Sequence, residues 1–167
     1  TNSYQTKKLY NVVKKFASLK GNETIYDLYC GTGTISIFLS EFAKEIIGIE
    51  TVKDAVLAAK DNAKLNKINN TKFIHGDVKH ILSEGIKESN EPDVIILDPP
   101  RNGLEKQVIS SVISLKPKKI IYVSCNSSTQ ARDLIDFKEF YKIKLSQPID
   151  MFPQTYHVEN VVLLEKI

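Results

Sequence analysis

Short runs of apolar and β-branched residues recur along most of the chain, and each is followed by a longer stretch that mixes apolar and charged positions. Such runs predict buried strands, and each intervening stretch is long enough for one helix. The predicted strands are Thr24–Tyr29, Ile46–Glu50, Thr71–His75, Val94–Asp98 and Lys119–Val123. Strands that alternate with helices form parallel crossovers, so the pattern predicts a doubly wound α/β fold.

Two of the intervening stretches have a clear helical period. In Lys53–Asn66 the apolar positions recur at close to 3.6 residues, and Asn66 is a suitable stop. Near the start of the chain, the apolar positions between Leu9 and Phe16 lie on one helical face, and Gly21 closes the segment. Both stretches are therefore predicted to be helices with one apolar face.

The pattern changes after residue 138. Tyr141–Leu145 alternates apolar residues with lysine, and Val158–Leu164 is a second strand-like run. The segment between them contains Pro148 and Pro153, so an antiparallel hairpin is predicted there. Residues 1–167 are thus expected to form one domain, with a mostly parallel seven-stranded sheet that ends in this hairpin.

Composition excludes several classes of protein. Hydrophobic residues make up 42% of the 167 positions and no low-complexity tract occurs, which excludes fibrous and disordered chains. The aliphatic runs are much shorter than the roughly 18 residues that a bilayer span needs. We therefore expect a soluble, cytoplasmic protein with no membrane partner and, by default, a monomer.

The net charge is only mildly basic, because 23 Lys and Arg residues oppose 20 Asp and Glu residues. This balance tolerates an RNA partner without requiring one, since nucleic-acid-binding domains often cluster a larger basic excess. The start of the chain is more basic, with Lys7, Lys8, Lys14, Lys15 and Lys20. A solvated helix face and an RNA-binding arm both account for these lysines.

Cysteine and histidine spacing gives no support to a disulfide framework or a metal site. Cys30 and Cys125 lie far apart and outside any C-x-x-C pair. His75 and His80 have no partner at a spacing typical of metal ligands. No metal is expected in this chain.

A glycine-rich turn, Asp-Leu-Tyr-Cys-Gly-Thr-Gly-Thr, follows the first predicted strand at residues 27–34. Gly31 and Gly33 allow backbone amides to approach a ligand where the next helix begins. The third glycine of the dinucleotide motif G-x-G-x-x-G is missing. Glu50 ends the second strand, where it could accept hydrogen bonds from both ribose hydroxyls of a nucleoside, or could cap a helix.

Two aspartates follow later strands. Asp77 comes after the third strand, where it could accept a hydrogen bond from an adenine amino group or could form a turn. Asp98 ends the fourth strand, and the two prolines after it fix an extended turn. Asp98 is therefore expected at the carboxyl edge of the sheet, where ligands bind.

Cys125 follows the fifth strand as a candidate nucleophile. Ser127, Ser128 and Thr129 are N-cap candidates for the helix after it, and a helix N-terminus favours the thiolate form of a nearby cysteine. Cys30, inside the glycine turn, is expected to pack as a small apolar side chain.

The start of the last predicted strand supplies a candidate base. His157 and Glu159 share a face by alternation. Glu159 could act as a general base or be an ordinary surface acid, and His157 is expected to make a structural hydrogen bond.

Taken together, these motifs closely resemble the RNA 5-methyluridine (uracil-C5) methyltransferases along the whole chain. The segments concerned are Asp-Leu-Tyr-Cys-Gly-Thr-Gly, Gly48-Ile-Glu, Asp98-Pro-Pro-Arg-Asn-Gly, Tyr122-Val-Ser-Cys-Asn with Thr129-Gln-Ala-Arg-Asp, and Asp150-Met-Phe-Pro-Gln-Thr-Tyr-His-Val-Glu. The last three are highly specific. The first two are shared by the wider class I of S-adenosylmethionine-dependent methyltransferases, which have a Rossmann-like fold.

The resemblance implies transfer of a methyl group from S-adenosylmethionine to C5 of a uridine in RNA, with S-adenosylhomocysteine as product. The uridine is expected in a loop or single strand, in 23S ribosomal RNA first and transfer RNA second. By this similarity Cys125 matches the nucleophile and Glu159 matches the base that removes the C5 proton. The matching cofactor contacts are Tyr29, Gly31, Gly33, Glu50 and Asp98.

Family members usually have parts that this sequence lacks. These are an N-terminal RNA-binding β-barrel, in many members an iron–sulfur cluster held by upstream cysteines, and a cofactor-binding glutamine in a Phe-x-Gln motif before the leading helix. Gln5 is not that glutamine. Because the chain also starts at Thr1, the resemblance implies the catalytic domain of a longer enzyme.

Other functions fit the sequence less well. A 5-methylcytosine RNA methyltransferase shares the thiol chemistry but usually has Pro-Cys after its fourth strand, and Asp98-Pro-Pro-Arg has no cysteine. An amino-group methyltransferase would have an aromatic residue where Arg101 stands. A non-catalytic nucleotide-binding module stays open, whereas the missing third glycine argues against an NAD-dependent oxidoreductase.

Overall fold

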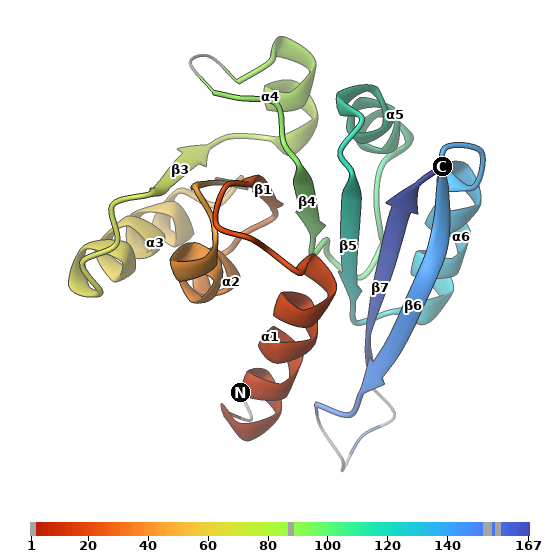
Figure 1. The fold of residues 1–167 in the computed structure, drawn as a ribbon, viewed down its shortest axis with the longest axis horizontal. Helices are drawn as coiled ribbons and strands as arrows, with labels where there is room; N and C mark the ends of the chain where they lie inside the picture. The colour runs from red at the N-terminus through yellow and green to blue at the C-terminus, as the bar shows by residue number, and fades with distance from the viewer. Residues whose placement is uncertain (1–2, 87–88, 152–154, 156–157) are drawn as a thin grey trace.

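The computed structural model describes residues 3–86, 89–151, 155 and 158–167, and it places a central sheet between two layers of helices (Figure 1). The strands are β1 (Thr24–Leu28), β2 (Glu45–Glu50), β3 (Thr71–His75), β4 (Val94–Leu97), β5 (Lys119–Ser124), β6 (Tyr141–Ile149) and β7 (Glu159–Lys166). The helices are α1 (Ser3–Ala17), α2 (Thr34–Leu39), the short 3₁₀ helix η1 (Ser40–Phe42), α3 (Lys53–Leu65), α4 (Val78–Glu84), α5 (Lys106–Leu115) and α6 (Ser127–Phe137).

The sheet has the strand order β3-β2-β1-β4-β5-β7-β6. The first five strands in this order are parallel, and β7 runs antiparallel to both β5 and β6. The predicted doubly wound sheet with a C-terminal antiparallel hairpin is therefore confirmed. The chain winds outward from β1 in one direction and from β4 in the other, and ligands of such sheets bind where the direction reverses.

Apolar side chains fill both faces of the sheet. Helices α1 and α2 cover one face with residues such as Val13 and Leu39, which are fully buried. Helices α4, α5 and α6 cover the other face, where Val112 and Phe137 are fully buried. The central strands carry isoleucine, leucine and valine on both sides because both sides are covered. Within the described ranges, no helix has the length and apolarity to span a bilayer.

The edge strand β6 is longer than the sequence pattern predicts. The alternation predicted a strand that ends at Leu145, but pairing with β7 continues to Ile149 through Pro148. A proline is tolerated there because an edge strand leaves one side of its backbone unpaired. The register shifts between Ile143 and Leu145, and residues 142–148 are all exposed.

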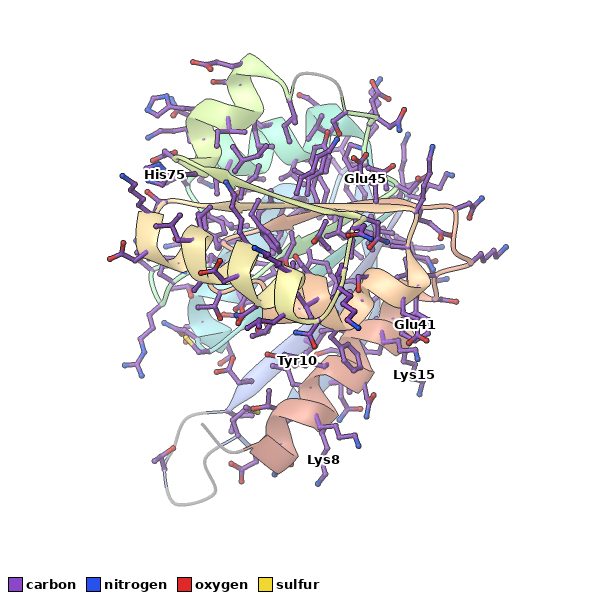
Figure 2. The ribbon with its side chains drawn as sticks, turned by 90° about the vertical axis from the view of Figure 1, so that its left-hand side faces the viewer. Lys8, Tyr10, Lys15, Glu41, Glu45 and His75 are labelled. Atoms are coloured by element: carbon purple, nitrogen blue, oxygen red, sulfur yellow. The ribbon has the colours of Figure 1, made fainter. Side chains whose placement is uncertain are left out.

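The lysines of α1 lie mainly on its solvent side. Lys8 and Lys15 are exposed on this helix (Figure 2). Lys14 is the exception, because its Nζ lies 3.5 Å from the centroid of the Phe42 ring, a cation–π contact. These contacts fit a solvated helix face, and an RNA-binding role for α1 stays a prediction.

Candidate active site

The residues singled out in the sequence come together at one edge of the sheet. The glycine turn follows β1, Glu50 ends β2, Asp77 follows β3, Asp98 follows β4 and Cys125 follows β5. Because these five strands are parallel, their carboxyl ends point the same way. The topology therefore gathers the predicted site at the edge where doubly wound sheets bind ligands.

The turn after β1 has an unusual backbone. Tyr29, Gly31 and Gly33 all have positive φ angles, of 65°, 54° and 76°. A Cβ at Gly33 would lie 2.7 Å from Cζ of Phe73, so this position excludes a side chain by space as well as by conformation. Tyr29 adopts a left-handed conformation that costs free energy in a bulky residue and is concentrated at functional sites.

Glu50 connects the glycine turn to the start of α3. Its Oε2 accepts a hydrogen bond from the Gly31 amide at 3.0 Å, and its Oε1 accepts one from the Val52 amide at 2.8 Å. The residue is 8% exposed. Each carboxylate oxygen keeps a further lone pair, so Glu50 can hold the two turns and still accept hydrogen bonds from a bound ligand.

Asp27 is a site residue that the sequence analysis did not single out. It is 1% exposed, and its Oδ2 accepts a hydrogen bond from Ser36 at 2.6 Å. Among the described residues, its Oδ1 has no hydrogen-bond partner. Burial raises the pKa of Asp27 to about 6. A charged residue inside an otherwise apolar strand was the available signal, because a buried carboxyl group needs a partner.

Asp77 and Asp98 are held differently. Asp77 is exposed and is the N-cap of α4, where its Oδ1 accepts a hydrogen bond from the Lys79 amide at 2.8 Å. Its predicted contact with adenine stays a prediction. Asp98 is partly buried, and its amide donates to the Leu28 carbonyl at 3.3 Å. Burial, and then the charges of Asp27 and Glu159, raise the pKa of Asp98 to about 7.

Cys125 and Glu159 both lie where the pairing of β5 with β7 ends. The antiparallel register of β5 and β7 ends at the pair Ser124 and Asn160. Cys125 is the next residue after Ser124, and Glu159 is the residue before Asn160, so each lies one residue beyond the last pair of this register. Cys125 is a partly exposed free thiol. Burial raises the pKa of Glu159, and the positive charge of Arg101 opposes this rise.

Gln130 fixes the two strand ends relative to each other. Its Nε2 donates to the carbonyls of Tyr122, at 2.9 Å, and Asn160, at 3.2 Å. Its Oε1 accepts a hydrogen bond from Asn160 Nδ2 at 2.7 Å. Gln130 is 2% exposed and lies on the inner face of α6, where a polar residue among apolar ones was a detectable signal.

The helix after Cys125 begins one residue earlier than predicted. Asn126, rather than Ser127, Ser128 or Thr129, is the N-cap, and its side chain accepts hydrogen bonds from the amides of Ser128 and Thr129. The backbone of Asn126 is extended, as an N-cap requires, and asparagine is among the strongest N-cap residues. Cys125 therefore directly precedes the cap.

Cys30 is buried and packs in a small cluster with Phe73, as expected, and its burial raises the pKa of the thiol. Tyr29 is partly buried, which raises the pKa of its hydroxyl group to about 12 and keeps that group protonated.

Gln5 donates from Nε2 to the Asp150 carbonyl at 2.7 Å and so connects α1 to the segment before β7. The prediction for His157 lies outside the described residues. In the part of the chain that the structure describes, no group of three or more His, Cys, Asp or Glu residues could hold a metal ion.

Comparison with known sequences decides the family. A family model described as tRNA (uracil-5-)-methyltransferase matches residues 2–167. The chain belongs to this family. An RNA methyltransferase of Bacteroides thetaiotaomicron is 52% identical over 166 residues, and one of Caldanaerobacter subterraneus is 50% identical over 167. Each match covers 99% of this chain but only 37% and 36% of those proteins. The chain thus spans little more than a third of these family members.

Solved structures agree with the family. The tRNA (uracil-54, C5)-methyltransferase of Pyrococcus abyssi, in complex with S-adenosyl-L-homocysteine, superimposes with a TM-score of 0.85 at 33% identity. The match covers 98% of this chain and 39% of that one. TrmN from Thermus thermophilus matches with a TM-score of 0.76 over 95% of this chain and 48% of its own. At 17% identity this second likeness shows the fold alone. The Rossmann-like fold of class I methyltransferases, expected from the motifs, is confirmed.

Proposed function

We propose that this chain is the catalytic domain of a longer enzyme that methylates C5 of a uridine in RNA, with S-adenosylmethionine as the methyl donor. The observation that carries the proposal is that Cys125 and Glu159 each lie one residue beyond the last pair of β5 and β7, at the sheet edge that also holds the glycine turn and Asp98. Family membership supports it, as does the S-adenosyl-L-homocysteine complex of the Pyrococcus relative.

The residues at this edge fit the proposed cofactor. The Glu50 carboxylate, near the glycine turn, keeps lone pairs for ribose hydroxyl groups. The buried Oδ1 of Asp27 offers a further acceptor beside the same turn. S-adenosylmethionine supplies an electrophilic methyl group when bound. We assign its binding to Tyr29, Gly31, Gly33, Glu50, Asp77 and Asp98.

The uracil ring needs help because its C5 is a weak nucleophile. In the proposed reaction the Cys125 thiolate bonds to C6, and the electron pair of the C5=C6 bond moves to C5 and O4. C5 then takes the methyl group as the bond between that methyl carbon and sulfur breaks, and the electron pair of the broken bond stays on sulfur in S-adenosylhomocysteine. Glu159 accepts the remaining C5 proton, the C5–H electron pair re-forms the C5=C6 bond, and the C6–S pair returns to sulfur. The burial that raises the pKa of Glu159 makes it a stronger base than an exposed carboxylate.

The proposed substrate is a uridine that can leave its stack. C6 is shielded within a helix, so the base must turn outward into the pocket, which favours loops and single strands. We propose 23S ribosomal RNA as the target, with transfer RNA as the competing one. The remaining two thirds of the longer protein would contribute to RNA binding, since this chain is only mildly basic.

The test replaces each cysteine of the complete protein in turn. Cys125→Ala is expected to lower methyl transfer to uridine by about 10³-fold or more, because the covalent step is lost. Cys30→Ala is the matched control and should stay near the wild-type rate, since Cys30 is a buried packing residue. Transfer is measured on 23S ribosomal and transfer RNA transcripts, with 5-methyluridine and 5-methylcytidine separated. Near-normal 5-methyluridine formation by Cys125→Ala contradicts the proposal.

A further inference from the structure

The loop that joins β4 to α5, residues 98–105, is held against the start of α6 through its own main chain. Four side chains of the α6 segment make these contacts, and we call them the α6 clasp. They are Asn126 Nδ2 to the Arg101 carbonyl (3.1 Å), Thr129 Oγ1 to the same carbonyl (3.1 Å), Arg132 Nη2 to the Asn102 carbonyl (2.9 Å), and Asp133 Oδ2, which accepts from the Leu104 amide (2.8 Å).

Asp133 is the centre of the clasp. The residue is 1% exposed, and its carboxylate also accepts hydrogen bonds from the Tyr122 hydroxyl at 2.7 Å and from Arg132 Nε at 2.9 Å. Tyr122 belongs to β5, three residues before Cys125. A single buried carboxylate therefore joins the strand that leads to the nucleophile, the helix that follows it and the neighbouring loop.

The loop has a glycine where it approaches the clasp most closely. Gly103 has a φ of 76°, and a Cβ there would lie 2.5 Å from Asp133 Oδ2 and 2.7 Å from Arg132 Nη2. No larger residue fits without moving the buried carboxylate or its arginine partner. The close contact thus depends on Gly103 in the loop and on Arg132 and Asp133 in the helix.

The clasp acts on Arg101 rather than on Asp98. Asp98 is held by β1 instead, because its main-chain amide donates a hydrogen bond to the Leu28 carbonyl. Asp98 precedes the loop residues that the clasp contacts. The Arg101 carbonyl is the acceptor of the first clasp contacts. Arg101 also bears on Glu159, because its positive charge opposes the rise in the pKa of that carboxyl group.

We propose that Thr129, Arg132 and Asp133 are positioning residues: they fix the main chain of the loop from Arg101 to Leu104, and the fixed loop in turn helps to place the Glu159 carboxylate for proton removal. This rests on the proposed function, in which Glu159 removes the C5 proton. The clasp then serves the second half of the reaction, release of the uridine from Cys125. It is not required for the first half, attack of Cys125 on C6.

The experiment separates these two halves in the complete protein. Thr129→Val removes one clasp hydroxyl at nearly constant volume, and Arg132→Met removes a half-exposed guanidinium but keeps an apolar stem. Single-turnover reactions with a uridine-containing RNA measure the formation and the decay of the denaturant-resistant protein–RNA adduct. Both variants are expected to slow decay about 10-fold, less than the roughly 10²-fold that complete loss of acid–base catalysis would cost, with formation within about 2-fold of wild type. Thr129→Ser should restore decay.

A control on the same helix tests for a merely structural effect. Asp136→Asn removes the ion pair of Asp136 with Lys106, which joins α6 to α5 without touching the loop. It should leave both steps unchanged. A second test combines Arg101→Met with Arg132→Met. If the clasp acts through Arg101, adding Arg132→Met slows decay no further than Arg101→Met alone.

The outcomes distinguish the clasp from the function on which it rests. Equal slowing of formation and decay, normal decay in both clasp variants, or additive slowing in the double variant overturns the clasp and leaves the proposed function standing. Turnover without any adduct, in the wild type and in Glu159→Gln, overturns the proposed function itself.

Discussion

Asp98 and Glu159 show how two partly buried carboxyl groups can differ in one site. Burial raises the pKa of both. Glu159 also faces the positive charge of Arg101, which favours its ionised form, whereas Asp98 faces the negative charges of Asp27 and Glu159, which favour its neutral form. Glu159 is thus suited to accept a proton, and Asp98, with a pKa of about 7, can donate a hydrogen bond near neutral pH.

Glu159→Gln should stop the proposed reaction after the covalent bond has formed. Glutamine cannot accept the C5 proton, so the protein–RNA adduct is expected to accumulate and to resist denaturant. Glu165→Gln, near the other end of β7, is the matched control and should turn over normally, because Glu165 makes only a partly exposed ion pair with Lys144. The adduct is detected on denaturing gels. Normal turnover by Glu159→Gln without an adduct would remove Glu159 from the mechanism.

Asp98→Asn should stabilise the protein at neutral and alkaline pH. The folded pKa of about 7 lies above the unfolded value of 3.8, so the wild type loses stability as pH rises between these values. Asparagine does not ionise. The variant should therefore gain about 2 to 4 kcal/mol over wild type by pH 8, at about 1.4 kcal/mol per unit of pKa difference, and no such gain at pH 4. Urea unfolding across this range measures the difference.

Asp93, just before β4, provides the opposite control. Its hydrogen bond to Lys118 is the main cause that lowers its pKa, so its contribution to stability is present above the unfolded pKa and is lost as pH falls. Asp93→Asn should destabilise the protein at neutral pH and have less effect in acid. The same pH trend in both variants would contradict the assignment for Asp98.

At the scale of elements, Gln130 links α6 to β5 and β7 through its side-chain hydrogen bonds. Gln130→Leu leaves the Asn160 side chain and two carbonyl groups without their partner, so it should lower the free energy of unfolding by about 2 to 4 kcal/mol. Hydrogen exchange should increase first at the start of β7. Gln147→Leu, an exposed position on β6, should change stability by less than about 0.5 kcal/mol. Equal losses of unfolding free energy in the two variants would contradict this linking role of Gln130.

The sequence predicted the elements well because their signals are local. Apolar runs marked β1 to β5 to within one residue at either end, and the strand-ending acids at Glu50 and Asp98 followed from those runs. The cap at Asn126 and the extension of β6 through Pro148 were missed, since both depend on neighbouring chain segments. Contacts such as Gln130 with Asn160 join residues that are distant in the sequence, and no local period encodes them.

At the scale of the molecule, the reversal of winding between β1 and β4 brings Glu50, Asp98 and Cys125 to one edge although they are far apart in the chain. The strand β2 illustrates the polarity of this arrangement, because it has a glutamate at each end. Glu50 accepts a hydrogen bond from the glycine turn. Glu45, on the opposite side of the sheet from His75 in Figure 2, pairs with Lys72 at 2.8 Å. Function is therefore expected at one edge only.

Binding of S-adenosylhomocysteine should therefore depend on the edge that holds Glu50 and not on the edge that holds Glu45. S-adenosylhomocysteine is expected to raise the melting temperature by several degrees, equivalent to about 2.7 kcal/mol at 100 times the dissociation constant, and NAD should give no rise. Glu50→Gln should greatly reduce the rise, and Glu45→Gln should preserve it. A thermal-shift series on the complete protein measures all four cases. A rise with NAD, or an equal loss in both variants, would contradict the cofactor assignment.

The exposed edge strand β6 has a consequence for behaviour in concentrated solution. Open strand edges are templates on which other chains can add, and this is a common route to aggregation. Three features of β6 interrupt that template: the register shift after Ile143, the lysines at positions 142 and 144, and Pro148, which has no N–H to donate. These features oppose the addition of another strand to β6. The open edge of the sheet at β6 is therefore expected to resist fibril formation with other copies of the chain.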